Sequence, residues 1–138
     1  MVLFFRGDAI LCTSLNGIIA EDALIDTFVI GNLGKNVFEA ISGAVEVKKK
    51  RALGIIETFT AASAIEAADA AVKSGYIELI EIRVARGMAG KCFVTLTGDV
   101  SDVRAAVDAG AMVAAEQGVL INTEVIANPH EELWDSIM

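Results

Sequence analysis

The sequence has 138 residues, the length of one ordinary domain or of one and a half small ones. Hydrophobic residues make up 54% of it and the formal net charge is −8, which argues against non-specific nucleic-acid binding because such binding needs clustered Lys and Arg. No apolar stretch reaches the roughly 18 residues that cross a bilayer, so we expect no membrane insertion and a buried interface between subunits. Cys12 and Cys92 lie far apart and predict reduced cytoplasmic thiols without a disulfide.

The first 50 residues alternate between strand-like and helix-like stretches. Leu3–Asp8 has the pattern of a strand followed by Gly-Asp, and Asp8 opens an apolar, helix-like stretch. Asp26–Asn32 then predicts a strand and Val37–Ile41 predicts a helix. The basic run Lys48–Arg51 follows, and we interpret it as a solvated linker in preference to a phosphate or RNA contact.

From residue 51 onward the pattern is that of one complete domain. Ala52–Glu57 is a short apolar run suited to a buried strand, and Thr58 and Thr60 offer caps for an Ala-rich helix over Ala61–Ser74. Gly75 is expected to end this helix. Tyr76–Ala85 alternates as a half-buried strand does. One face of that strand is predicted to carry Ile80, Ile82 and Val84.

The second part of this domain predicts a loop, a strand, a helix, a strand and a short terminal helix. These elements are expected at Arg86–Lys91, at Cys92–Thr97, from Asp99 to about Gln117, at Val119–Ile126 and from Asn128–Pro129 onward. Asn128 is the expected cap of the last helix and Pro129 its first residue. The order strand, helix, strand, strand, helix, strand predicts a ferredoxin-like α+β fold, in which the helices cover one face of an antiparallel sheet.

The first 50 residues resemble the second half of this same unit, which indicates a weak internal repeat. Gly7-Asp8 matches Gly98-Asp99, the strand at Asp26–Asn32 parallels Asn122–Asn128, and the helix at Val37–Ile41 parallels Leu133–Ile137. The sequence therefore predicts a partial half domain plus linker at residues 1–50 and a complete domain at residues 51–138. Half a domain cannot close its own core, so we expect it to pack against the complete domain or against a neighbouring chain.

Residues 52–134 resemble the shell domain of bacterial microcompartments, known as the BMC domain. The segments that carry the resemblance are Ala52–Thr58, Ala64–Lys73, Leu96–Val100, Ala105–Gly110 and Val125–Leu133. The loop Gly87–Phe93, the stretch Gly98–Val103 and Trp134 are most similar to the second domain of tandem-domain shell proteins of the propanediol-utilisation type. The front half of the corresponding first domain has no counterpart in residues 1–50.

The resemblance implies a self-assembling structural protein and not an enzyme. Such proteins form a cyclic disc with six domain slots, filled by a hexamer of single domains or a trimer of tandem ones, and the discs tile with other shell proteins into a sheet around metabolic enzymes. A central pore admits small metabolites. The resemblance thus implies location in a cytoplasmic microcompartment shell, with no cofactor and no nucleic-acid or membrane partner.

Two sets of residues follow from the resemblance as candidate sites. The pore loop is expected to consist of Arg86, Gly87, Met88, Ala89, Gly90 and Lys91. Glycine lets the backbone approach a symmetry axis, and the positive side chains favour polar or anionic metabolites. A plain hairpin is the alternative, whereas a phosphate loop is disfavoured because Lys91 is followed by Cys92 and a strand.

The expected tile edge consists of Lys73, Asn128, Pro129 and His130. The alternative for Lys73 is a solvated side chain that interacts with the C-terminus of its helix. Asn128 stands where the family commonly has Arg, so a weaker edge contact is expected. Metal binding at His130 is disfavoured because the chain has no second histidine.

Catalysis has little support in the sequence. Glu57, Glu66 and Asp69 could be drawn as acid–base groups, but Glu66 and Asp69 lie three residues apart on a helix and are expected to be solvated. Two other functions stay open. One is an electron-transferring shell protein with an iron–sulfur cluster at the pore, and the other is a ferredoxin-like regulator that binds a small molecule.

Overall fold

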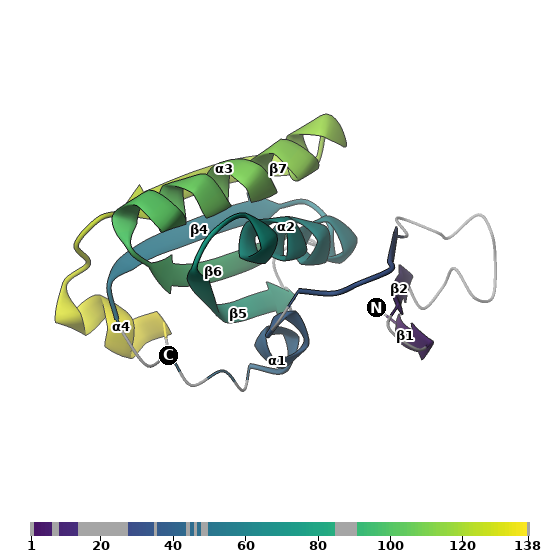
Figure 1. Cartoon of the computed structure of the whole chain (residues 1–138), viewed down its shortest axis with the longest axis horizontal. Coiled ribbons are helices and arrows are strands. Elements are labelled where there is room, and N and C mark those ends of the chain that lie inside the picture. Colours follow the sequence, from purple (N-terminus) through teal and green to yellow (C-terminus); the bar gives the residue numbers. More distant parts are fainter. Residues whose placement is uncertain are drawn as a thin grey trace.

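The computed structural model describes residues 2–6, 9–13, 28–34, 36–43, 45, 47, 50–84 and 91–137. Its largest part is a four-stranded antiparallel sheet with strand order β5-β6-β4-β7. The strands are β4 (Ala52–Thr58), β5 (Ile77–Val84), β6 (Cys92–Gly98) and β7 (Leu120–Ile126). The helices α2 (Ala61–Ser74) and α3 (Val100–Glu116) pack side by side over one face of this sheet (Figure 1). This arrangement confirms the predicted α+β fold with the order strand, helix, strand, strand, helix, strand.

Small residues set how closely the two helices approach the sheet. Thr60 caps α2 by accepting a hydrogen bond from the Ser63 N–H at 3.1 Å. Gly110 lies on the buried face of α3, and a Cβ atom there would come within 2.7 Å of the Ala67 carbonyl oxygen and within 2.6 Å of Ile56. Gly54 similarly leaves room for Val103, so α3 lies directly on β4. Among the described helices, none has both the length and the apolarity that a membrane span requires.

The prediction that Ile80 shares a face with Ile82 and Val84 is wrong. The pairing of β5 with β6 shifts between Leu79 and Glu81, as in a β-bulge. The extra residue reverses the alternation, so Ile82 packs toward α2 and α3 whereas Ile80 packs on the opposite face of the sheet. The bulge thereby places a further buried apolar residue beside Leu53 on the outer face of the sheet, the face that α2 and α3 do not cover.

The last helix, α4 (Glu131–Ile137), covers part of that outer face. Its Trp134 is 3% exposed and clusters with Leu53 and Ile80. The helix begins two residues later than predicted, so Pro129 is not its first residue and Asn128 is not its cap. His130 precedes the helix instead, and its Nδ1 accepts a hydrogen bond from the Glu132 N–H at 3.4 Å.

The N-terminal part of the chain forms a second, three-stranded antiparallel sheet in the order β1-β2-β3. Its strands are β1 (Val2–Arg6), β2 (Ala9–Thr13) and β3 (Phe28–Ile30), and the helix α1 (Val37–Ser42) follows. The helix expected after Asp8 is therefore wrong over Ala9–Thr13. A five-residue apolar run has too little length to show a helical or a strand period, and here it finds a pairing partner in β1.

In the described residues, the strands β1 and β3 and the helix α1 occur where the repeat predicts two strands and a helix, and β3 and α1 pack on the larger unit. Phe28, Ile30, Val37 and Ala40 are buried in the same apolar cluster as α2 and β5. The strands β1 and β2 lie to one side of the molecule (Figure 1). In the part of the chain that the structure describes, residues 28–43 thus pack on the larger unit, and Val45 and Val47 pack against its two apolar clusters.

Candidate functional site

The two ends of the four-stranded sheet carry different residues. At one end Gly98 pairs with both Ala52 and Ile77, and we call this the Gly98 end. At the other end Cys92 pairs with both Thr58 and Val84, and we call this the Cys92 end. The strand β7 runs from Leu120, which pairs with Thr58, to Ile126 beside Leu53. The chain therefore leaves β7 at the Gly98 end.

The candidate edge residues all lie at the Gly98 end. Lys73 lies in the last turn of α2, just before β5 begins at Ile77. Asn128 and Pro129 follow β7, and together with Gly98 and Trp134 they line a cavity of about 520 Å³. Both parts of the predicted edge, which are separated by more than 50 residues in sequence, thus lie at the same end of the strands. They lie beside opposite edges of the sheet, because Lys73 precedes the edge strand β5 and Asn128 follows the other edge strand, β7.

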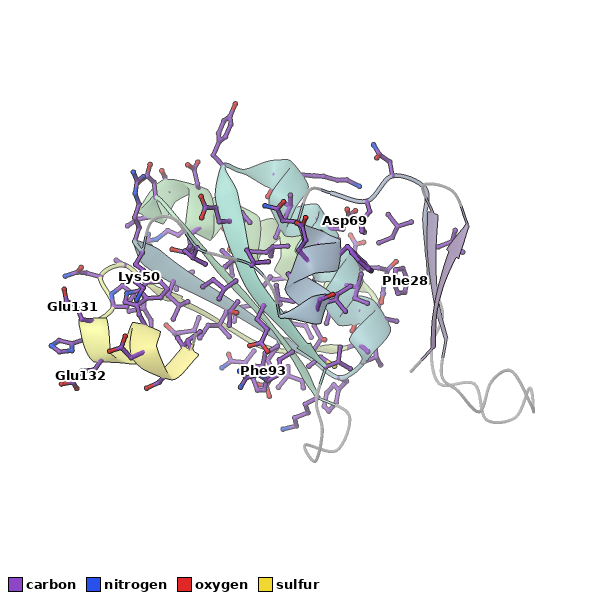
Figure 2. All side chains as sticks on the ribbon, turned by 90° about the horizontal axis from the view of Figure 1, so that it is seen from below. Phe28, Lys50, Asp69, Phe93, Glu131 and Glu132 are labelled. Carbon is purple, nitrogen blue, oxygen red and sulfur yellow. The ribbon has the colours of Figure 1, made fainter. Side chains whose placement is uncertain are left out.

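Lys73 is bound within its own chain. Its Nζ donates to Asp69 Oδ2 and to the Asn32 carbonyl oxygen, each at 2.6 Å. The other carboxylate oxygen of Asp69 accepts from the Gly34 N–H at 2.6 Å. Asp69 is 8% exposed, so the expectation that it is solvated is wrong. Figure 2 shows Asp69 and Phe28 on the side of the domain that faces the N-terminal strands.

The residues around Lys73 were missed by sequence reasoning, although one signal was present. Asp69 lies four residues before Lys73, and this spacing places an acidic and a basic side chain together on a helix. Asn32 and Gly34 gave no comparable signal, because their contacts to α2 depend on how residues 28–43 pack.

The basic linker is partly tied to the domain by acidic partners. Arg51 Nη1 pairs with Asp99, and Lys50 Nζ lies 3.9 Å from Asp135. Since Arg51 directly precedes β4 and Asp99 directly precedes α3, the first pair joins the starts of two elements at the Gly98 end. Both pairs are exposed, and pairs of this kind contribute at most about 1 kcal/mol each.

The residues Arg86–Gly90 of the candidate pore loop lie outside the described residues. Lys91, the last residue of that loop, is half-buried and lies at the Cys92 end. Nearby, the Glu81 carboxylate raises the pKa of Arg83, first through a side-chain hydrogen bond and second through its charge. Arg83 therefore stays positively charged at any physiological pH.

His130 has a local role in the chain. Its carbonyl oxygen accepts from the Leu133 N–H at 3.0 Å, in the first turn of α4. Figure 2 shows the neighbouring Glu131 and Glu132 at the far end of the domain from Asp69. Among the residues that the structure describes, no three His, Cys, Asp or Glu side chains are grouped so that they could hold a metal ion.

We predict that this chain does not hold an iron–sulfur cluster. Clusters need several thiolates that converge on one point, whereas Cys92 is 1% exposed within β6 and Cys12 lies in the N-terminal strand β2. The measurement is anaerobic reconstitution with iron and sulfide, followed by iron analysis and visible absorption. Stoichiometric iron that disappears in Cys92→Ser would contradict the prediction and favour the electron-transfer function.

Known proteins resemble this chain over most of its length. The family model described as "BMC domain" matches residues 52–129. The bacterial microcompartment shell protein PduT of Citrobacter freundii is 43% identical over 116 residues, which are 84% of this chain and 63% of PduT. The shell protein EutM of Salmonella typhimurium is 42% identical over 82 residues, which are 59% of this chain and 83% of EutM.

A solved structure shows the same likeness in three dimensions. A crystal structure of a microcompartment protein from Desulfitobacterium hafniense superposes with a TM-score of 0.80 at 46% identity, and the match covers 86% of this chain and 66% of that one. The chain thus spans slightly less than two thirds of PduT and of the Desulfitobacterium protein. With a BMC-domain match over more than half of its residues, the chain belongs to the BMC-domain family of bacterial microcompartment shell proteins.

Proposed function

We propose that this protein is a structural, non-catalytic subunit of a bacterial microcompartment shell. It forms ring-shaped oligomers of three or six chains, and the rings tile with one another and with other shell proteins. The observation that carries the proposal is the separation of the two candidate sites: Lys73 and Asn128–His130 lie at the Gly98 end of the sheet, whereas Lys91 lies at the Cys92 end. A tile needs this polarity, because one end must face its neighbours and the other must face the ring axis.

The edge of the proposed tile is the Gly98 end, with Lys73, Asn128, Pro129 and His130. An ammonium group has three N–H donors, and the described contacts of Lys73 use two of them. Its side chain is 46% exposed, so the third donor can reach an acceptor on another tile. The relatives named as shell proteins support an assembly role.

The pore of the proposed ring is lined by Arg86, Gly87, Met88, Ala89, Gly90 and Lys91. Copies of a loop that meet at an axis add their electrostatic fields. Two cations in six residues of a chain with net charge −8 would therefore make the axis locally positive, which favours small polar or anionic metabolites. The position of Lys91 at the end of the sheet opposite the edge supports this placement.

We predict a ring of three or six chains in solution. The described surface exposes several large apolar side chains, among them Phe59 and Met112, as expected of a protein that buries further surface on assembly. The measurement is native mass spectrometry together with light scattering over a concentration series, followed by electron microscopy for sheets. A stable monomer at micromolar concentration would contradict the shell proposal and favour the small-molecule regulator.

A further inference from the structure

Asp69 is nearly buried and has a polar contact on each side of its carboxylate. Oδ2 accepts from Lys73 Nζ and Oδ1 accepts from the Gly34 N–H, each at 2.6 Å. Asp69 comes from α2, whereas Gly34 belongs to the segment between β3 and α1. One carboxylate therefore joins the N-terminal part of the chain to the candidate edge lysine.

The segment at Asn32 and Gly34 completes the arrangement from its own side. The Asn32 carbonyl oxygen accepts from Lys73 Nζ at 2.6 Å, two residues before the Gly34 N–H that binds Asp69. Close packing holds this segment, since a Cβ atom at Gly34 would lie 3.1 Å from Val72 and 3.3 Å from Asp69 Oδ1. Lys73 thus donates to two acceptors, one on α2 and the other on the segment between β3 and α1.

These contacts decide the direction of a side chain that is otherwise free to move. A lysine side chain has four rotatable bonds, and immobilising it during assembly opposes binding. Lys73 has its ammonium group held while 46% of the side chain stays exposed. Its ordering is therefore complete before a neighbouring tile arrives, and that raises the affinity of the contact.

We propose that Asp69 is a positioning residue for the tile edge: together with the Asn32–Gly34 segment it fixes the Lys73 ammonium group, so that both parts of the chain build one edge. The role at the edge rests on the proposed shell function. We call the fixed position of the Lys73 ammonium group, held by Asp69 and the Asn32 carbonyl oxygen, the lock. The lock is a property of the single chain and can be measured without assembly.

The test uses the variant Asp69→Asn in the full chain. The amide oxygen of Asn can still accept from Gly34, but the side chain no longer carries the negative charge that attracts Lys73. The first measurement is the rate at which Lys73 is modified by an amine-reactive reagent, followed by mass spectrometry. Lys50 is the internal reference, because its side chain is 40% exposed, close to that of Lys73.

We expect Lys73 to react about threefold faster in Asp69→Asn, as the loss of a partly exposed ion pair predicts, while Lys50 reacts as before. The critical concentration for sheet formation should rise about fivefold, because the lysine must then be ordered during assembly. Ring size should not change. Asp108→Asn is the matched control, since it removes the same charge from an exposed position on α3.

A second variant, Gly34→Val, tests the part that the N-terminal segment plays. Its side chain would push the segment away from Val72 and from Asp69 while leaving the charge of Asp69 unchanged. We expect faster modification of Lys73 here as well. An unchanged Lys73 rate in both variants would overturn the lock, and faster modification with unchanged sheets would overturn its role at the edge. A parent protein without rings would overturn the shell proposal instead, and the modification rates would still decide the lock.

Discussion

Replacing Gly110 with valine is expected to lower the free energy of unfolding by about 3 kcal/mol, the upper part of the range for overpacked cores. Gly110 is the point at which α3 crosses α2 and β4. A Cβ atom at this position would lie 2.7 Å from the Ala67 carbonyl oxygen and 2.6 Å from Ile56 Cδ1. Ile56 can change rotamer, but the Ala67 oxygen belongs to the backbone of α2. The helices must therefore move apart.

Two effects on the free energy of unfolding oppose each other in this variant, and the larger one decides whether the protein is stabilised or destabilised. Valine forms helices better than glycine by roughly 0.3 kcal/mol, whereas the backbone contact costs several times more. Thermal unfolding at one fixed protein concentration is the measurement, and the midpoint should fall by more than about 10 °C. Ala105→Val is the control, because it places the same side chain on an exposed position of α3. A Gly110→Val midpoint within two degrees of the control would show that the helices tolerate the larger separation.

Replacing Lys73 with aspartate is expected to abolish sheet formation while the ring persists. The change reverses a charge at the proposed edge and removes the donor to the Asn32 carbonyl oxygen. It also places a second carboxylate four residues after Asp69 and a negative charge at the C-terminus of α2, which together destabilise the chain by about 1 kcal/mol. That loss is small beside the buried core that Lys73 does not enter.

Electron microscopy of the purified variant, together with its native mass, measures both parts of this expectation. Arg104→Asp is the matched control, since it makes the same change of charge at an exposed position in the first turns of α3. The control should form sheets. If Lys73→Asp also forms sheets at the parent concentration, Lys73 acts only within its own chain and the edge lies elsewhere.

Much of the larger unit could be predicted because its signals are local. Thr60 caps α2, apolar residues recur along its buried face, and its observed bounds, Ala61–Ser74, are those predicted. The strands from β4 to β7 were predicted to within one residue at either end by short apolar or alternating runs. The order of these elements then leaves few ways to cover one face of an antiparallel sheet.

The errors occurred where a residue's partner lies far away in the sequence. Ile80 faces α4 because β5 gains an extra residue opposite β6, and the alternation within β5 itself carries no sign of this. Ala9–Thr13 forms a strand because β1 lies beside it. In both places the local pattern permits two answers, and hydrogen bonding to a neighbouring strand selects one.

The candidate site likewise has features that the sequence indicates and features that only the tertiary structure shows. The sequence by itself was enough to propose its residues, because Lys73 and Asn128–His130 lie in segments that carry the family resemblance. Only the tertiary structure decided that these residues lie at the same end of the strands, beside opposite edges of the sheet, and that Asp69 is buried against Gly34. The physical reason is that a carboxylate becomes a connecting group only when packing places a donor on each side of it, and one of its two donors comes from a segment 35 residues away.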